Sequence, residues 1–388
     1  MTTLISLIGK SKADPKTGYR TANYRFDDSF AREVPFFGMG LQEYVKPQKL
    51  VLAGTAGSMW DVFFDHQQTD DENILTLVEA VANESVTSEM LNVHEQRLSE
   101  KFGIPVQCLL ISYARDKDEQ IAILNTLAHA VEPGDSIILD VTHGFRHLPM
   151  LALVAARYLA HVRKVTVQEL YYGALEMTAP DTKETPVLRL GAMLEMLDWV
   201  EALATYDQSG NYGVFSELLK NDGMDPQRAD LLLQAAYFER CSNPVQARQA
   251  LTGVLNPVRE HQGAMGSLFR DTLTERISWF RSGSRATWEL SLADSYLERQ
   301  DYLRAITYMC EAYISRLTEE FGGDVNKFED RDEAFHRSDK NQDVWLLKNL
   351  RNAMTHGVRT DSRDAKRLLQ DQPALDKKLR ALRKALFQ

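Results

Sequence analysis

Arg351 and His356 stand five positions apart near the carboxyl end of the chain, with Asn352 beside the arginine. An arginine carries a permanent cation that neutralises phosphate charge, and a histidine can transfer a proton at neutral pH. Together these groups supply what cleavage of an RNA phosphodiester needs without a metal ion. Asn352 adds a neutral hydrogen-bonding group. We therefore interpret Arg351, Asn352 and His356 as half of a candidate catalytic site.

The same spacing occurs a second time, at Arg331 and His336. Such pairs arise by chance in a chain with nine histidines and abundant arginine, so the spacing alone has little specificity. Asp332 and Glu333 follow Arg331 directly and would repel a phosphate. This difference favours the pair at 351 and 356. A structural role within a helix is the alternative interpretation of either pair.

The residues that lead to His356 have the pattern of a helix. Apolar residues between 344 and 350 fall on one helical face, and Gly357 is a typical helix end. In an ideal helix the side chains of Arg351 and His356 point roughly 140° apart. They can approach one face only if the helix ends or distorts at His356. A second copy related by a two-fold axis would supply another arginine and histidine.

The first half of the sequence alternates short apolar runs with helical patterns, which is typical of a parallel sheet with helices on both faces. A short hairpin is also expected around residues 24–26. The expected strands are 4–8, 49–53, 106–111, 136–140 and 165–172.

Polar or glycine-rich segments follow three of these strands, at 9–11, 54–58 and 140–146. In open parallel sheets ligands bind beyond the carboxyl ends of the strands, so we expect the three segments to converge on a ligand. The first segment reads Gly-Lys-Ser but is not a P-loop, because position 4 is leucine where that motif requires glycine. The alternative role of the segment at 140 is to cap the next helix and to form hydrogen bonds within its own turn.

The pattern changes at about residue 190, after which every segment has the apolar spacing of helices. We therefore expect a sheet-containing domain over 1–190. The helical remainder is expected to form a connecting region over 191–300 and a terminal domain over 301–388, with a single helical domain over 191–388 as the alternative.

Composition restricts the class of protein. A formal net charge of −10 argues against coating nucleic acid by bulk electrostatics, although basic residues gather between 359 and 384. The three cysteines form no CxxC pair, so neither a disulfide framework nor a zinc site is expected. The start of the sequence lacks a basic leader, and no apolar run reaches the length of a membrane span. We expect a cytoplasmic protein.

Two distant segments resemble one known family. Residues 140–144 read Asp-Val-Thr-His-Gly and are similar to the signature of the CRISPR-associated DxTHG-motif proteins, and 351–356 matches the RxxxxH motif of HEPN ribonucleases. The loop at 54–61 also resembles loops of this group, whereas 205–300 carries no motif that we can match. The resemblance implies an α/β, Rossmann-like CARF domain that senses cyclic oligoadenylate in type III CRISPR defence, followed by an all-α HEPN ribonuclease domain.

The same resemblance implies a homodimer or higher oligomer with the cyclic oligoadenylate across the two-fold axis of the CARF domains. Cyclic tetra-adenylate is the first candidate for this allosteric activator. Backbone N–H groups and basic side chains suit its phosphates. The candidate contacts are Lys10, Ser11, Thr55, Gly57, Ser58, Asp140, Thr142, His143, Gly144 and Arg146.

For the chemistry, the resemblance implies a metal-independent endoribonuclease acting on single-stranded RNA. The 2'-hydroxyl would attack the neighbouring phosphorus and leave a 2',3'-cyclic phosphate and a 5'-hydroxyl. His356 would act as acid or base or position the reacting groups, Arg351 would stabilise phosphoryl charge, and Asn352 would orient the histidine or the substrate. Two alternatives are a ligand-sensing regulator without nuclease activity and a ring nuclease that degrades its own activator through Ser11, Thr142 or His143.

Overall fold

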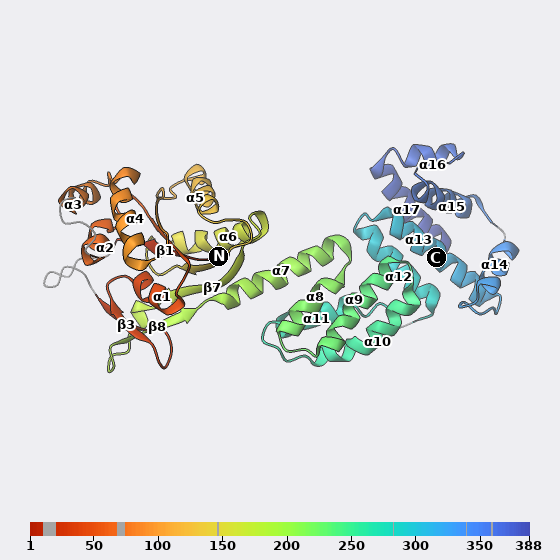
Figure 1. Ribbon diagram of the computed structural model, residues 1–388. Coiled ribbons are helices and arrows are strands. Elements are labelled where there is room, and N and C mark those ends of the chain that lie inside the picture. Colours follow the sequence, from red (N-terminus) through yellow and green to blue (C-terminus); the bar gives the residue numbers. More distant parts are fainter. Residues whose placement is uncertain (11–20, 68–73, 146, 282, 339, 358–359) are drawn as a thin grey trace. The chain divides into compact units, whose positions relative to one another are not determined.

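The computed structural model describes residues 1–10, 21–67, 74–145, 147–281, 283–338, 340–357 and 360–388. The chain divides into two compact units, Met1–Leu194 and Glu195–Gln388 (Figure 1). Ser11 and Arg146, two of the candidate ligand contacts, lie outside the described residues.

The first unit is built on an eight-stranded sheet in the order β3-β2-β8-β7-β6-β1-β4-β5. Neighbouring strands from β7 to β5 in this order are parallel, which confirms the predicted mostly parallel sheet. All five expected strands are present, and β2 and β3 form the expected antiparallel hairpin. The strands are β1 (Thr2–Ile8), β2 (Ala22–Arg25), β3 (Ala31–Val34), β4 (Lys49–Gly54), β5 (Val106–Leu110), β6 (Ser136–Asp140), β7 (Thr166–Gly173) and β8 (Glu184–Arg189).

Strand β8 is absent from the sequence-based expectation. It contains Pro186, and a proline within a short apolar run argues against a strand. In the structure β8 runs antiparallel to β7 and connects the β2–β3 hairpin to the main sheet. A short 3-10 helix, η1 (Leu175–Met177), lies between β7 and β8.

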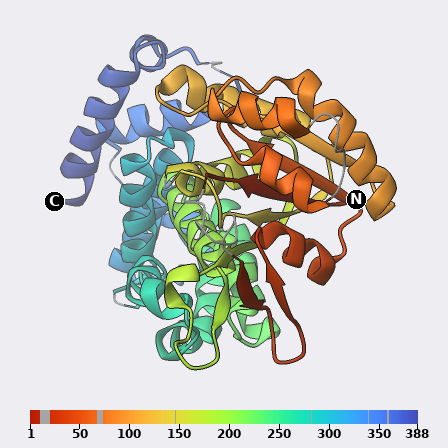
Figure 2. The same cartoon turned by 90° about the vertical axis from the view of Figure 1, so that its left-hand side faces the viewer.

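Side chains of β1 alternate between two hydrophobic cores, as a strand buried on both faces requires. Leu4 and Ile8 belong to the core under one set of helices, and Ile5 and Leu7 belong to the core under the other. Helices therefore lie on both sides of the central strands (Figures 1 and 2). The first set is α1 (Phe37–Val45), α2 (Trp60–Gln67), α3 (Ile74–Ala82) and α4 (Ser88–Phe102), and the second is α5 (Lys117–His129) and α6 (His147–Val162).

The second unit contains helices and no strand among its described residues. It has two hydrophobic cores, one formed from α7 to α11 and one from α12 to α17, with Trp279 packed against both. The first core involves α7 (Gly191–Ser209), η2 (Tyr212–Val214), α8 (Phe215–Asn221), α9 (Pro226–Arg240), α10 (Pro244–Glu260) and α11 (Gly266–Arg276). The second core involves α12 (Arg285–Glu298), α13 (Tyr302–Glu320), α14 (Phe328–Arg337), α15 (Gln342–Thr355), α16 (Arg363–Leu368) and α17 (Gln372–Phe387). None of the described helices combines the length and apolarity that crossing a membrane requires.

Candidate functional site

The loops that follow β1, β4 and β6 meet at the carboxyl edge of the sheet. Strand β1 lies between β4 and β6. Strands β4 and β5 extend the sheet on one side of β1, and β6 and β7 extend it on the other, so the strand order reverses at β1. Gly9 and Gly144 touch there, because a Cβ atom on Gly9 would lie 2.3 Å from the backbone nitrogen of Gly144. The two glycines therefore allow the loops to approach each other.

Four of the candidate ligand contacts line one small cavity of about 40 Å³ at this edge: Lys10, Thr55, Ser58 and Gly144. The volume is more than one water molecule needs, so a small group can enter the cavity. The Nζ atom of Lys10 lies 3.8 Å from a carboxylate oxygen of Glu84, and both side chains are exposed. The cation beside the cavity is thus exposed and loosely paired with one carboxylate.

The hydroxyl groups of Thr55 and Ser58 are buried and engaged within the loop. Ser58 Oγ donates to the carbonyl of Ile8 at 2.7 Å and accepts the backbone N–H of Thr55 at 2.9 Å. These bonds tie the loop after β4 to the end of β1. Gly57 is also confined, since a Cβ atom there would lie 2.9 Å from the hydroxyl of Tyr113.

Asp140 is buried at the end of β6 and is held by two hydrogen bonds. Ser6 Oγ donates to Oδ2 at 2.6 Å, and the backbone N–H of Thr142 donates to Oδ1 at 2.9 Å. Burial raises the pKa of Asp140 to about 6, while both hydrogen bonds favour the carboxylate and limit the rise. Ser6 did not emerge from sequence analysis, because it lies 134 residues away from Asp140.

Thr142 and His143 also form internal hydrogen bonds. Thr142 Oγ1 accepts the backbone N–H of Gly173 at 2.9 Å, which connects the ends of β6 and β7. His143 Nε2 accepts the backbone N–H of Phe37 at 3.0 Å, at the start of α1. Burial lowers the pKa of His143 to about 4, in agreement with a neutral ring whose Nε2 carries no proton. Both side chains position the elements around the cavity.

An aromatic group lies at the rim and was missed by sequence analysis. The rings of Tyr113 and Phe145 are 5.8 Å apart, and Phe145 stacks on His147 at 5.8 Å. The guanidinium of Arg115 lies 4.5 Å from the centre of the Tyr113 ring. Phe145 is 43 % exposed, so this group presents aromatic faces to solvent. Tyr113 follows the strand at 106–111, just as the three predicted loops follow their strands. Its position after a strand could therefore have marked it as a candidate ligand contact.

The candidate catalytic residues lie at the end of α15. Asn341 caps the start of this helix by accepting the backbone N–H of Val344 at 3.0 Å. The helix ends at Thr355, and His356 has non-helical dihedral angles of φ −106° and ψ 19°. Gly357 follows with φ +72°, a conformation that glycine adopts without strain. The predicted helix end at His356 is thereby confirmed.

Asn352 is bonded to the arginine. Nε and Nη2 of Arg351 donate to Asn352 Oδ1 at 3.2 and 3.0 Å. The family resemblance implies that Asn352 orients His356 or the substrate, and in the structure its Oδ1 atom accepts hydrogen bonds from the guanidinium of Arg351. His356 is exposed and its backbone N–H donates to the carbonyl of Asn352 at 3.0 Å. Arg351 lines a cavity of about 340 Å³, and His356 is not among the residues of that cavity.

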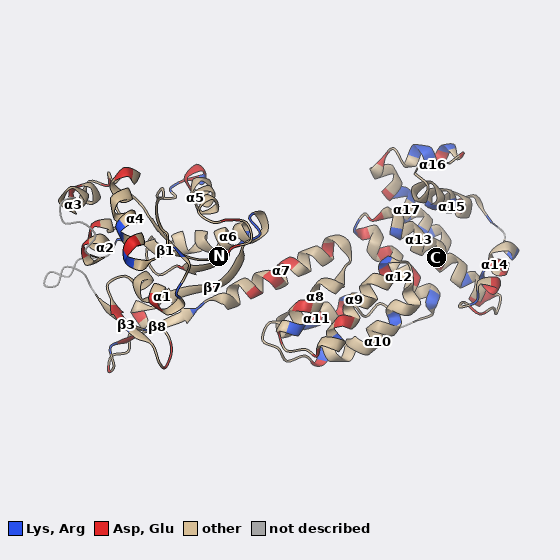
Figure 3. Ribbon diagram, viewed as in Figure 1, with Lys and Arg blue, Asp and Glu red and all other residues tan. Residues whose placement is uncertain are grey.

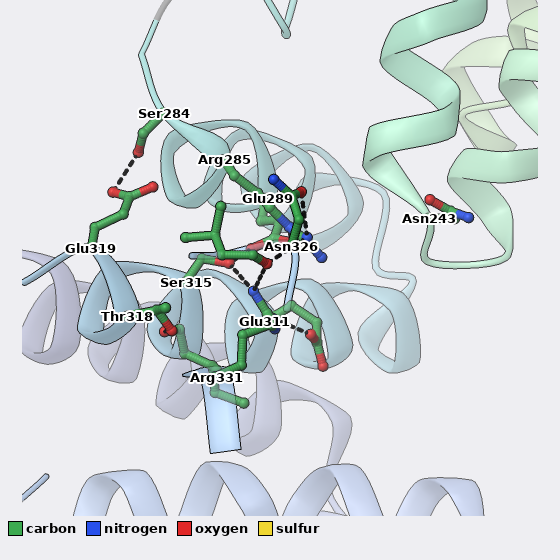
Figure 4. A network of polar contacts seen from close by, with 12 residues as sticks. Asn243, Ser284, Arg285, Glu289, Glu311, Ser315, Thr318, Glu319, Asn326 and Arg331 are labelled. Atoms are coloured by element: carbon green, nitrogen blue, oxygen red, sulfur yellow. Dashed lines mark hydrogen bonds and ion pairs between the residues drawn. The ribbon is translucent and has the colours of Figure 1, made fainter. Parts of the chain in front are cut away.

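The second Arg and His pair has a different environment. Arg331 is only 12 % exposed, and its guanidinium contacts Glu311 Oε2 at 2.6 Å and Ser315 Oγ at 2.7 Å. Ser315 in turn donates to Glu289 at 2.5 Å, so the network connects α12, α13 and α14 (Figure 4). His336 is 70 % exposed and lies 3.5 Å from Asp332. The guanidinium of Arg331 is therefore neutralised by a carboxylate inside the helical unit, whereas that of Arg351 is bonded to the neutral amide of Asn352.

Four of the basic residues near the carboxyl end are paired with carboxylates. Figure 3 shows Lys and Arg on α16, where Arg367 lies 3.6 Å from Asp364. On α17, Lys378, Arg380 and Arg383 each contact an aspartate at 3.0 Å or less. This run has the character of a solvated helical surface. Among the residues that the structure describes, no group of three or more His, Cys, Asp or Glu is placed to hold a metal ion.

Comparisons with known proteins connect the first unit to a family. Residues 3–176 match the family described as CRISPR system endoribonuclease Csx1, CARF domain. A relative named CRISPR-associated protein MJ1674, from Methanocaldococcus jannaschii, is 25 % identical over 270 residues, which cover 63 % of this chain and 42 % of the relative. The alignment thus spans less than half of that relative's length. These two matches support a CARF protein of type III CRISPR systems, with its CARF domain in the first, sheet-containing unit.

Proposed function

We propose that this protein is a single-stranded endoribonuclease of the HEPN type that acts in the cytoplasm and is switched on by a cyclic oligoadenylate. The observation that carries the proposal is the end of α15, where an arginine without a carboxylate partner among the described residues precedes an exposed histidine. The same chain carries, over residues 3–176, a segment that matches the CARF domain of Csx1 endoribonucleases.

The activator would bind at the carboxyl edge of the sheet in the first unit. Lys10 and the backbone at Gly144 offer a cation and a close approach to a phosphate, and the cavity between them has room for one small group. Tyr113 and Phe145 offer aromatic faces for adenine rings. A cyclic oligoadenylate is larger than the cavity, so only part of it would enter there. In keeping with the family resemblance, two copies of the chain would share one ring across a two-fold axis.

In the proposed reaction, the 2'-oxygen of the RNA forms a bond to the adjacent phosphorus and the bond from phosphorus to the 5'-oxygen breaks. His356 takes the proton from the 2'-hydroxyl or gives one to the leaving 5'-oxygen. Arg351, oriented by Asn352, stabilises the charge that builds on the phosphoryl oxygens. Because one chain supplies one histidine, the second copy in a dimer would supply the second proton-transfer group.

The test measures RNA cleavage by the full-length protein with cyclic tri-, tetra- and hexa-adenylate, followed by analysis of the product ends. Arg351→Ala and His356→Ala are each expected to lower the rate by about 100-fold or more. The matched control is His336→Ala, which removes an exposed histidine of the same spacing and should retain the rate. Full activity in both the Arg351 and the His356 variants would refute the assignment.

The two alternative functions predict different outcomes of the same assay. A ligand-sensing regulator would bind the cyclic oligoadenylate without cleaving RNA. A ring nuclease would release linear oligoadenylate even in the His356→Ala variant. Of the three residues considered for ring cleavage, Thr142 Oγ1 and His143 Nε2 already accept backbone N–H groups, from Gly173 and Phe37, and Ser11 lies outside the described residues.

A further inference from the structure

The cavity beside Arg351 is lined in part by aromatic rings, which the cleavage reaction itself does not require. It measures about 340 Å³ and lies between α13, α14 and α15. Its walls include the rings of Phe328 and Phe335, and Phe328 is 76 % exposed. An exposed phenylalanine at the edge of a cavity offers a ring on which a planar ligand can stack.

Cationic side chains surround the aromatic wall. The Nζ atoms of Lys340 and Lys348 lie 4.8 and 5.1 Å from the centre of the Phe335 ring, and Lys348 also lies 5.3 Å from the ring of Trp345. Within the described part of the chain, neither of these lysines nor Arg351 forms an ion pair with a carboxylate. Aromatic rings next to unneutralised cations are the combination that binds single-stranded nucleic acid, in which bases stack and phosphates pair.

One carboxylate in the cavity wall is placed to discriminate between bases. Glu311 is occupied by its ion pair with Arg331. Asp332 is 53 % exposed, and its Oδ1 atom lies 3.5 Å from Nε2 of the exposed His336. A carboxylate accepts a hydrogen bond from the exocyclic amino group of cytosine, adenine or guanine. It repels the carbonyl oxygen that uracil carries at the position where cytosine has its amino group.

We propose that this cavity binds one nucleobase of the RNA substrate, stacked against the exposed ring of Phe328, and that Asp332 selects bases with an exocyclic amino group over uracil. The phosphate next to that base would then lie at Arg351, which lines the same cavity. This inference rests on the proposed ribonuclease function and names Asp332 as a residue that determines its specificity.

The test measures binding separately from cleavage. Short 2'-O-methyl oligonucleotides of cytidine, adenosine or uridine lack the attacking hydroxyl, and their affinity for the full-length protein is followed by fluorescence anisotropy with and without cyclic tetra-adenylate. We expect the cytidine and adenosine oligonucleotides to bind roughly tenfold more tightly than the uridine one, since a half-exposed charged hydrogen bond contributes at the lower end of its usual range. Asp332→Asn should remove most of this preference, and Phe328→Ala should weaken binding of all three.

Glu333→Gln is the matched control, because Glu333 is the exposed neighbour of Asp332, pairs with Arg337 and does not line the cavity. Equal affinity for the three oligonucleotides, or an unchanged preference in Asp332→Asn, would overturn the proposal. Loss of all binding together with a shift from dimer to monomer in Phe328→Ala would also overturn it, in favour of a protein contact at this cavity.

Cleavage of unmodified RNA separates this inference from the proposed function. Equal cleavage of cytidine and uridine oligonucleotides would refute base selection while the ribonuclease function stands. The expected binding preference without any cleavage would support the cavity as a base site and refute the ribonuclease function.

Discussion

Replacement of the buried Asp140 by asparagine should change how the stability of the first unit depends on pH. Its carboxyl group has an ordinary pKa of 3.8, and burial in the folded protein raises this pKa to about 6. A carboxyl group with a raised pKa favours the folded state below its unfolded pKa, and this contribution is lost as the pH rises through the folded pKa. Stability of the wild-type first unit should therefore fall between about pH 4 and pH 6 on account of this group.

The magnitude follows from the two pKa values. They differ by about 2.2, and each pKa unit corresponds to about 1.4 kcal/mol, so the ionised group costs about 3 kcal/mol above pH 7. Asparagine has nearly the same shape as the protonated acid, does not titrate, and can still accept the backbone N–H of Thr142. Asp140→Asn should thus match the wild type near about pH 4 and exceed it by about 3 kcal/mol near about pH 8.

Urea unfolding at a series of pH values measures this difference, and hydrogen exchange of peptides from β1, β4 and β6 assigns it to the first unit. Asp181→Asn is the control, because Asp181 is exposed in the turn between β7 and β8. A wild type and an Asp140→Asn variant with parallel stability curves from about pH 4 to pH 8 would refute the argument from burial.

Three further predictions follow from packing and charge. Arg331→Ala should destabilise the second unit by about 3 kcal/mol, because it breaks a nearly buried ion pair with Glu311. Arg351→Ala should lower the free energy of unfolding by less than about 1 kcal/mol. Urea unfolding measures both losses, and equal losses would contradict a structural role for Arg331 alone. Gly9→Ala should destabilise the first unit by about 1 to 3 kcal/mol, because the added Cβ atom would overlap the backbone of Gly144. The same overlap should weaken binding of cyclic oligoadenylate, which calorimetry measures. An unchanged affinity would contradict a binding site at these two loops. Glu239 is buried on α9, where the hydroxyl of Tyr296 donates to its Oε1 atom at 2.8 Å, and burial raises the pKa of its carboxyl group from 4.5 to about 7. Glu239→Gln should therefore stabilise the protein by about 3 kcal/mol near about pH 8 and by little near about pH 4. A constant difference across this range in urea titrations would exclude the titration of Glu239 as its cause.

Much of the fold was predictable from local pattern. Apolar runs of strand length between helical patterns predicted the parallel sheet, and Gly357 predicted the end of α15 at His356. These features depend on the spacing of apolar residues over a few neighbouring positions, and this periodicity is visible in the sequence. Strand β8 is the exception, because Pro186 obscured a strand that its neighbours β2 and β7 stabilise.

The chemical state of the candidate sites was decided by contacts between distant residues. Arg331 and Arg351 have the same spacing to a histidine, but only Arg331 meets the carboxylate of Glu311 from another helix. Ser6 reaches Asp140 across 134 residues, and Phe37 reaches His143 across 106. The residue types and the elements that carry them could be read from local pattern alone. Which charges are neutralised and which stay open to a ligand depends on the fold, because desolvation and hydrogen bonding need partners that come together only when the chain folds.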